Sequence, residues 1–154
     1  MSGPEPHEVP LDLLPGEQAT QKQAAGASAL VSQLLDEADH ARWESLASAL
    51  GMADGQPHPR IGRLVQHISV SKRGYWEAIA DALSVPGPPP ELDLNGVCRW
   101  EVERAAGLGA GQLATVLTYC GRPLSVSELL RLNARHTVWH AGQIAALCSG
   151  PKLA

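Results

Sequence analysis

The chain has 154 residues, of which 44% are hydrophobic and 18% are charged, and its formal net charge is −4. This length suits one domain with a sizeable core, and the composition is that of a folded protein, not a disordered one. The negative charge argues against a general nucleic-acid binder, which needs a basic face. No apolar run approaches the roughly 18–20 residues that cross a membrane, and no secretion signal is visible, so we expect a cytoplasmic protein without membrane or nucleic-acid partners.

The N-terminal residues 1–20 are rich in proline, glutamate and glycine and show no periodicity, which predicts a flexible tail. A single domain is expected to follow over residues 21–154. Its first helix is predicted from about Gln21, with apolar residues at the 3.6-residue period, and Gly51 is its expected C-terminal stop.

The second helix is predicted from about Pro59 to Val85. Proline suits the first helical turn, where its missing N–H costs nothing, and the proline-rich run 86–90 prevents the helix from continuing. A third helix is predicted from about Asn95 to Cys120. No segment shows sustained strand alternation, so no strand is expected.

The fourth helix is predicted to open at Ser125, since Ser125 and Glu128 have the spacing of a capping box, and to end at Gly150. Four amphipathic helices joined by short links predict an all-α fold, a four-helix bundle. The three cysteines are widely spaced and form no CxxC motif, so we expect free thiols and no cysteine zinc site.

Two histidines, His136 and His140, are separated by one turn of the fourth helix. Residues at i and i+4 lie about 5–6 Å apart at Cβ, so both imidazoles can reach one ion. His140 falls within the apolar stripe and His136 on its flank. His67, at the border of the second helix's stripe, is the candidate third ligand. The alternative is that the pair are ring side chains in the core, with hydrogen-bond partners there.

Two known metal motifs do not fit the chain. In the HExxH motif of zinc proteases a glutamate is the general base, and Thr137 stands at that position here. A ferritin-like di-iron site needs two E-x-x-H motifs. The chain has one, Glu37 to His40, and His40 is expected to project away from its helix's apolar stripe.

The segment LVQHISVSKRGYW around His67, and the later segment LSVSELLRLNARHTVWHAGQIAAL, resemble the DinB superfamily over about residues 25–150. The resemblance implies a DinB-like four-helix bundle, in which one histidine of the second helix and the HxxxH of the fourth bind one divalent metal ion. Carried over residue by residue, it makes His67, His136 and His140 the metal ligands.

Three neutral imidazoles suit zinc, nickel, iron or cobalt, and the sequence does not distinguish these metals. Three protein ligands leave open positions, as in catalytic sites. Asn133 and Gln143 are each within about one turn of a ligand, so we expect them to hydrogen-bond the second ring nitrogens of the histidines. The alternative for Gln143 is an amide on the surface or in helix packing. Tyr75 and Arg104 are the candidates for the substrate pocket, although their alternatives are the core and a solvated face.

The DinB resemblance implies a metal-dependent thiol S-transferase or isomerase, which uses a low-molecular-weight thiol such as mycothiol and acts on a small electrophilic substrate. One alternative is a thiol-independent cyclase, isomerase or hydrolase in secondary-metabolite biosynthesis. Another is a non-catalytic metal-binding scaffold assembled as a homodimer. The spacing of the carboxylates does not require any of them to lie beside the metal, so no general base is predicted.

Overall fold

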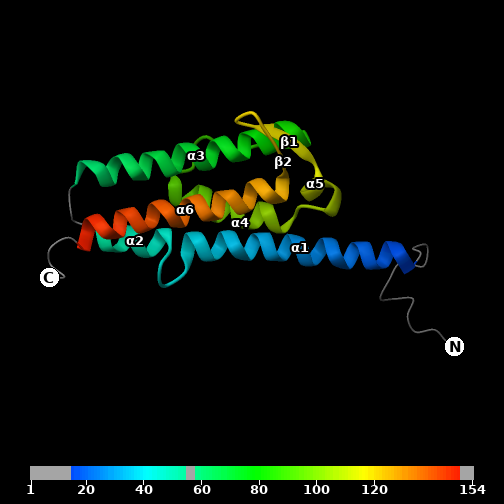
Figure 1. Ribbon diagram of the computed structural model, residues 1–154, viewed down its shortest axis with the longest axis horizontal. Coiled ribbons are helices and arrows are strands. Elements are labelled where there is room, and N and C mark those ends of the chain that lie inside the picture. Colours follow the sequence, from blue (N-terminus) through cyan, green and yellow to red (C-terminus); the bar gives the residue numbers. More distant parts are fainter. Residues whose placement is uncertain (1–14, 55–57, 150–154) are drawn as a thin grey trace.

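The computed structural model describes residues 15–54 and 58–149, and of residues 15–25 and 149 the backbone alone. These ranges are mostly helical, with a small antiparallel sheet of two strands. The elements are α1 (Pro15–His40), α2 (Leu46–Ala53), α3 (Pro59–Leu83), α4 (Leu94–Ala106), α5 (Ala110–Ala114), β1 (Val116–Tyr119), β2 (Arg122–Ser125) and α6 (Val126–Ser149). The longest helices, α1, α3 and α6, run side by side, and the hairpin lies near the start of α6 (Figure 1). None of the described helices is long and apolar enough to cross a membrane.

The two helices that carry the candidate histidines follow the predictions closely. Helix α3 begins at Pro59 and ends at Leu83, after which Ser84 has a left-handed backbone with φ of 55°. Before α6, the capping box is confirmed. The N–H of Ser125 donates to Oε1 of Glu128 at 2.8 Å, and the N–H of Glu128 donates to Oγ of Ser125 at 3.0 Å.

The prediction of one helix from Gln21 to Gly51 was wrong at both ends and in the middle. Helix α1 includes residues 15–20, which the sequence assigns to the flexible tail, while residues 1–14 lie outside the described ranges. Helix α1 ends at His40, and Ser45 caps the separate α2 by accepting a hydrogen bond from the N–H of Ser48 at 3.1 Å. Both helices pack on α6, so their apolar residues continue one pattern across the break.

The predicted third helix, Asn95 to Cys120, was also wrong in its second half, as was the expectation of no strand. Helix α4 ends at Ala106, and a hairpin occupies residues 116–125. Cys120 and Gly121 have φ of 51° and 79°, and two positive φ values at the centre are what a two-residue type I′ turn requires. Each strand has four residues, which is too short for an alternation pattern to stand out.

Two clusters of buried apolar side chains form the core of the described part. One surrounds Leu35, Trp76 and Leu129, and the other surrounds Ile68 and Ile144. Helix α6 contributes to both and packs on α1, α2 and α3. The packing of α3 on α6 positions the candidate site, because His67 lies on α3 and the other two histidines on α6.

Candidate metal centre

The three histidines selected from the sequence come together between α3 and α6. Nε2 of His136 lies 3.1 Å from Nε2 of His67 and 3.1 Å from Nε2 of His140. All three pairs of ring nitrogens lie within 4.8 Å of one another. The His67 side chain is exposed and the other two are partly buried, so the cluster opens to solvent at His67.

Hydrogen bonding alone does not account for this convergence. A ring nitrogen carries either one hydrogen or one lone pair, so Nε2 of His136 cannot serve two partners at once. Nδ1 of His140 lies 2.7 Å from Oε1 of Gln143. An amide oxygen only accepts, so Nδ1 of His140 is the donor, and in the neutral ring Nε2 then keeps a lone pair. That lone pair faces the other histidines, which is the arrangement of a metal-ligand set.

The spacing of the nitrogens fits a transition metal ion. Tetrahedral coordination with metal–nitrogen bonds of about 2.0–2.1 Å separates two ligand nitrogens by about 3.3 Å. The two short separations here are 3.1 Å. Small rotations of the rings would therefore bring the three nitrogens to bonding distance of one ion.

The electrostatics favour the neutral form that binds metal. Burial, together with the two neighbouring histidines and Lys72, lowers the pKa of His136 to about 4. His136 is therefore an uncharged imidazole at neutral pH, and only an uncharged imidazole can be a ligand.

Of the two amides predicted to support the ligands, the structure places one beside a histidine. Gln143 accepts the Nδ1–H of His140, one turn away on the exposed side of α6. Asn133 is fully buried and its hydrogen bonds lie elsewhere. Its Oδ1 accepts from Nζ of Lys72 at 3.0 Å, and its Nδ2 donates to Oε1 of Glu101 at 2.8 Å.

Tyr75 lies next to the histidines, as expected of a residue near the site. Its ring centroid is 5.9 Å from that of His136 and 5.3 Å from that of Tyr119 on the hairpin. The side chain is buried, and burial raises the pKa of its hydroxyl to about 12. The hydroxyl therefore stays protonated at neutral pH, so Tyr75 can act as a hydrogen-bond donor and not as a base.

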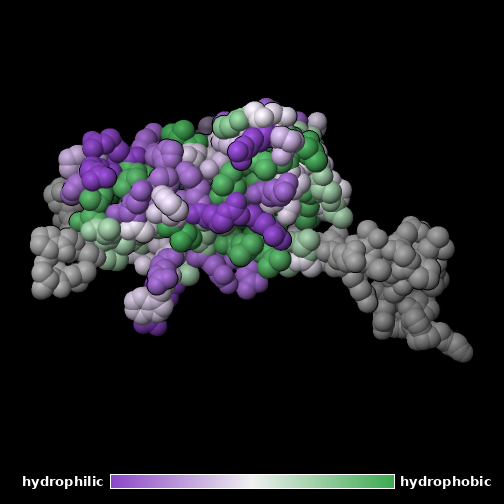
Figure 2. Space-filling view, viewed as in Figure 1, coloured by the Kyte–Doolittle hydropathy of each residue, from purple (hydrophilic) through white to green (hydrophobic). Residues whose placement is uncertain are grey.

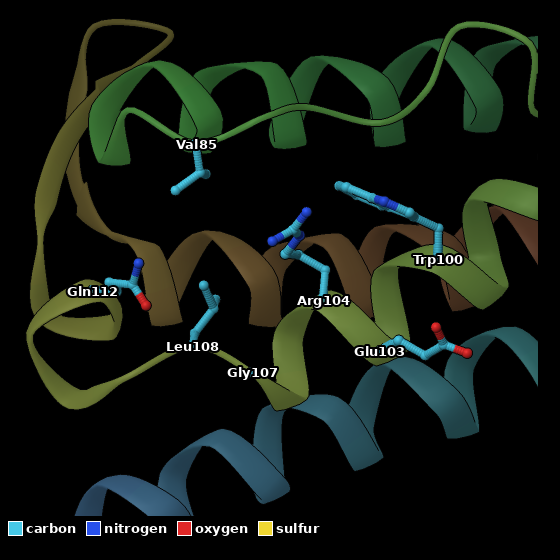
Figure 3. A pocket seen from close by; sticks show the side chains of 7 residues that line it. All are labelled: Val85, Trp100, Glu103, Arg104, Gly107, Leu108 and Gln112. Atoms are coloured by element: carbon cyan, nitrogen blue, oxygen red, sulfur yellow. The ribbon is translucent and has the colours of Figure 1, made fainter.

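Arg104 lies in a different place. It lines a cavity of about 260 Å³ together with Val85, Trp100 and Gln112, and the lining includes none of the three histidines. Figure 3 shows Arg104 and Trp100 projecting from α4 toward the segment that follows α3. The Arg104 guanidinium lies 5.5 Å from the Trp100 ring centroid, so a cation–π contact occupies it. The structure therefore does not bring Arg104 to the histidine cluster.

The sequence analysis missed a buried ionic cluster formed by α1, α3, α4 and α6. Nζ of Lys72 lies 3.0 Å from Oδ1 of Asp39 and contacts Oε2 of Glu101, and all three side chains are at most 1% exposed. Nε1 of Trp76 donates to Oε1 of Glu101 at 2.8 Å. The Lys72–Asp39 approach lacks hydrogen-bond geometry, and within the described ranges neither Asp39 carboxylate oxygen has a hydrogen-bond partner. A signal existed, since Lys72 follows the buried Ile68 by one turn and so lies in the apolar stripe of α3.

The two carboxyl groups of this cluster behave differently. Burial and the neighbouring Glu101 raise the pKa of Asp39 to about 9, although Lys72 acts in the opposite direction. Burial acts in the same direction on Glu101, but Lys72 and several hydrogen bonds hold its pKa below the usual value. At neutral pH the cluster therefore contains a protonated Asp39, an anionic Glu101 and a cationic Lys72, with no net charge.

Comparisons with models of protein families, with curated proteins and with solved structures gave no match to this chain. A function for the protein is therefore supported by the geometry of its own side chains. The strongest feature is three ring nitrogens from two helices, brought together with one side open to solvent. Such a set can hold one ion and leave room for another molecule beside it.

Proposed function

We propose that the protein is a DinB-like four-helix bundle whose His67, His136 and His140 bind one divalent transition metal ion. The observation that carries this proposal is the convergence of three Nε2 atoms, with separations of 3.1 Å that hydrogen bonds cannot all explain. The hydrogen bond from His140 to Gln143 supports it, because metal-bound histidines usually donate their second N–H to an oxygen. Zinc, nickel, iron and cobalt all suit three imidazoles.

The site has the character of a catalytic centre. Structural zinc sites are closed by four protein ligands, whereas this set has three and opens to solvent at His67. A bound ion would polarise a carbonyl group or lower the pKa of a water or thiol beside it. The protein's own residues would confine the molecule on the Tyr75 side, where the protonated hydroxyl can donate a hydrogen bond.

The reaction we favour is the transfer of a low-molecular-weight thiol to a small electrophile, or an isomerisation that uses such a thiol. The thiol must come from outside the chain. Cys98 and Cys148 are buried, and burial raises the pKa of the Cys98 thiol far above its usual value. Cys120 is exposed in the turn of the hairpin, and the cavity that it lines includes none of the three histidines. A soluble thiol such as mycothiol would therefore supply the nucleophile.

Metal content tests the centre directly. The chain, purified without a histidine tag, should hold about one transition metal ion per molecule by elemental analysis. His67→Ala, His136→Ala and His140→Ala should each lose most of this metal and keep their helical circular dichroism. His40→Ala is the matched control, because His40 is exposed and pairs with Asp36 on the surface. A chain that carries no metal and takes up none on titration would contradict the proposal.

Product formation tests the chemistry. Metal-loaded protein should conjugate mycothiol, bacillithiol, glutathione or cysteine to a model electrophile faster than protein stripped by a chelator does. His140→Ala should behave like the stripped protein. Equal rates in all three forms with every thiol would reject the thiol transferase for those electrophiles. A thiol-independent cyclase, isomerase or hydrolase with the same three ligands would then take its place.

A further inference from the structure

A second cavity, of about 540 Å³, lies between the hairpin and the first half of α6. Its volume falls within the range of about 300–1,000 Å³ that is typical of small-molecule sites. Three arginines line it, Arg122 from β2 and Arg131 and Arg135 from α6. Figure 2 shows hydrophilic residues across the middle of this face, where α6 runs in Figure 1.

The charge in this cavity is strongly unbalanced. Glu128 is the one carboxylate among its lining residues, and its Oε1 is engaged by the N–H of Ser125. Within the described ranges, none of the three guanidinium groups forms an ion pair or a hydrogen bond. In a chain with a net charge of −4, these three exposed arginines concentrate positive charge around one hollow. The planar guanidinium fork matches a carboxylate or a phosphate group.

Two ring contacts link the cavity to the histidine cluster, although none of the three histidines lines it. Tyr119 lines the cavity and its ring is 5.3 Å from that of Tyr75, which is in turn 5.9 Å from the ring of His136. Arg135 also directly precedes His136 on α6. The rings of Tyr119 and Tyr75 therefore form a path from the edge of the cavity to His136.

We propose that this cavity, which we call the arginine pocket, binds the oxyanion of a small molecule, a carboxylate or a phosphate. The same molecule extends past Tyr119 toward the histidine cluster. The pocket thus selects substrates, or thiols, that carry an anionic group at one end. The second step rests on the proposed metal centre, whereas anion binding in the pocket does not depend on metal.

Calorimetric titration with two probes tests the pocket. Inorganic phosphate and the dicarboxylate glutarate are titrated separately, and the probe that binds identifies the class of oxyanion. Arg131→Gln and Arg122→Gln should each weaken binding at least about tenfold, as expected for the loss of a charge-assisted hydrogen bond. Arg99→Gln is the matched control, because Arg99 is exposed on α4 and lies outside the pocket. The absence of saturable binding of both probes, or equal binding in Arg131→Gln, would overturn the proposal.

Cys120 provides a second measurement of where the anion binds. It lines the pocket and is exposed, whereas Cys98 and Cys148 are buried. A saturating probe should slow the alkylation of Cys120 by iodoacetamide in the parent and not in Arg131→Gln. Equal alkylation with and without the probe would place the anion elsewhere. His140→Ala should lose its metal and still bind the probe. A parent protein that binds the probe but holds no metal would refute the metal centre alone.

The reach from the pocket to the histidines has its own test. Cobalt-loaded protein is titrated with 6-mercaptohexanoate and with the neutral 6-mercaptohexanol, and the absorption of the metal reports binding. The carboxylate compound should bind at least about tenfold more tightly, and Arg131→Gln should remove this preference. Equal affinity of the two thiols in the parent would show that the arginine pocket does not serve the histidine cluster.

Discussion

Replacing Lys72 by methionine is expected to destabilise the fold severely. The Lys72 side chain is 1% exposed, and its Nζ lies 3.0 Å from oxygens of Asp39 and Asn133 and also contacts Glu101. Methionine keeps much of the chain's volume but removes the positive charge. Two carboxyl groups, each with a side chain that is 0% exposed, would then share the site with no cation.

The size of the effect follows from the burial. Removing one partner of a buried ion pair costs about 3–5 kcal/mol, because the other charge stays buried without compensation. A typical domain has a free energy of unfolding of about 5–15 kcal/mol. Lys72→Met should therefore lose about a fifth of the stability or more, and its melting temperature should fall by about 6–20 °C.

The loss should depend on pH with a definite sign. Without Lys72, the folded state raises the pKa of both carboxyl groups above their unfolded values of about 4, so it binds more protons than the unfolded chain above that pH. The variant's stability must then fall as the pH rises. Its deficit relative to the parent should be smaller at about pH 5 than at about pH 8.

Urea unfolding of the parent, Lys72→Met and Arg99→Met at both pH values measures this. Arg99 is exposed on α4, so its substitution should change the free energy of unfolding by no more than about 0.5 kcal/mol. A Lys72→Met chain as stable as the Arg99→Met control would refute the description of the buried cluster. A loss of unfolding free energy that is the same at both pH values would refute the protonation states assigned to Asp39 and Glu101.

Two further substitutions distinguish a residue that orients a metal ligand from a residue that stabilises the fold. Gln143→Leu should weaken metal affinity about 10–100-fold in competition with a chelating dye, because His140 loses the acceptor of its Nδ1–H, and the melting temperature should hardly change. Asn133→Leu should do the reverse, lowering the free energy of unfolding by about 1–3 kcal/mol because Lys72 and Glu101 lose a buried partner, with little effect on metal affinity. A larger loss of metal in Asn133→Leu than in Gln143→Leu would contradict these roles.

The candidate site was predictable because its signals are local. His136 and His140 are one turn apart, so any helix through them places both on one face. The limits of that helix were also marked locally, by the reciprocal bonds of Ser125 and Glu128. Only the third ligand, His67, lies on another helix and had to be placed relative to α6. Its position at the border of the apolar stripe of α3, next to the completely buried Ile68, indicated that it faces the other histidines.

The errors arose where a secondary-structure boundary depends on only one or two residues, or on a residue type that is unusual at such a position. The break between α1 and α2 depends on the single cap at Ser45, and the apolar pattern runs through it undisturbed. The hairpin depends on positive φ values at Cys120 and Gly121, and cysteine is not a residue that normally indicates such a turn. A glycine-rich stretch with apolar residues on either side was therefore assigned to a helix.

The buried ionic cluster shows that the helix face on which a charged residue lies predicts its burial better than its residue type does. His40 was expected to face solvent, and it is exposed. The preceding residue, Asp39, is turned by about 100° on the same helix and is 1% exposed. The same reasoning applied to α3 places Lys72 inside, at a position where an uncompensated charge would be prohibitively costly. A lysine and an aspartate on the inner faces of two helices therefore need a charged or polar partner in the core. That partner is Glu101 on α4. The glycines after Ala106 made the limits of this helix uncertain in the sequence, so the inward position of Glu101 was not predicted.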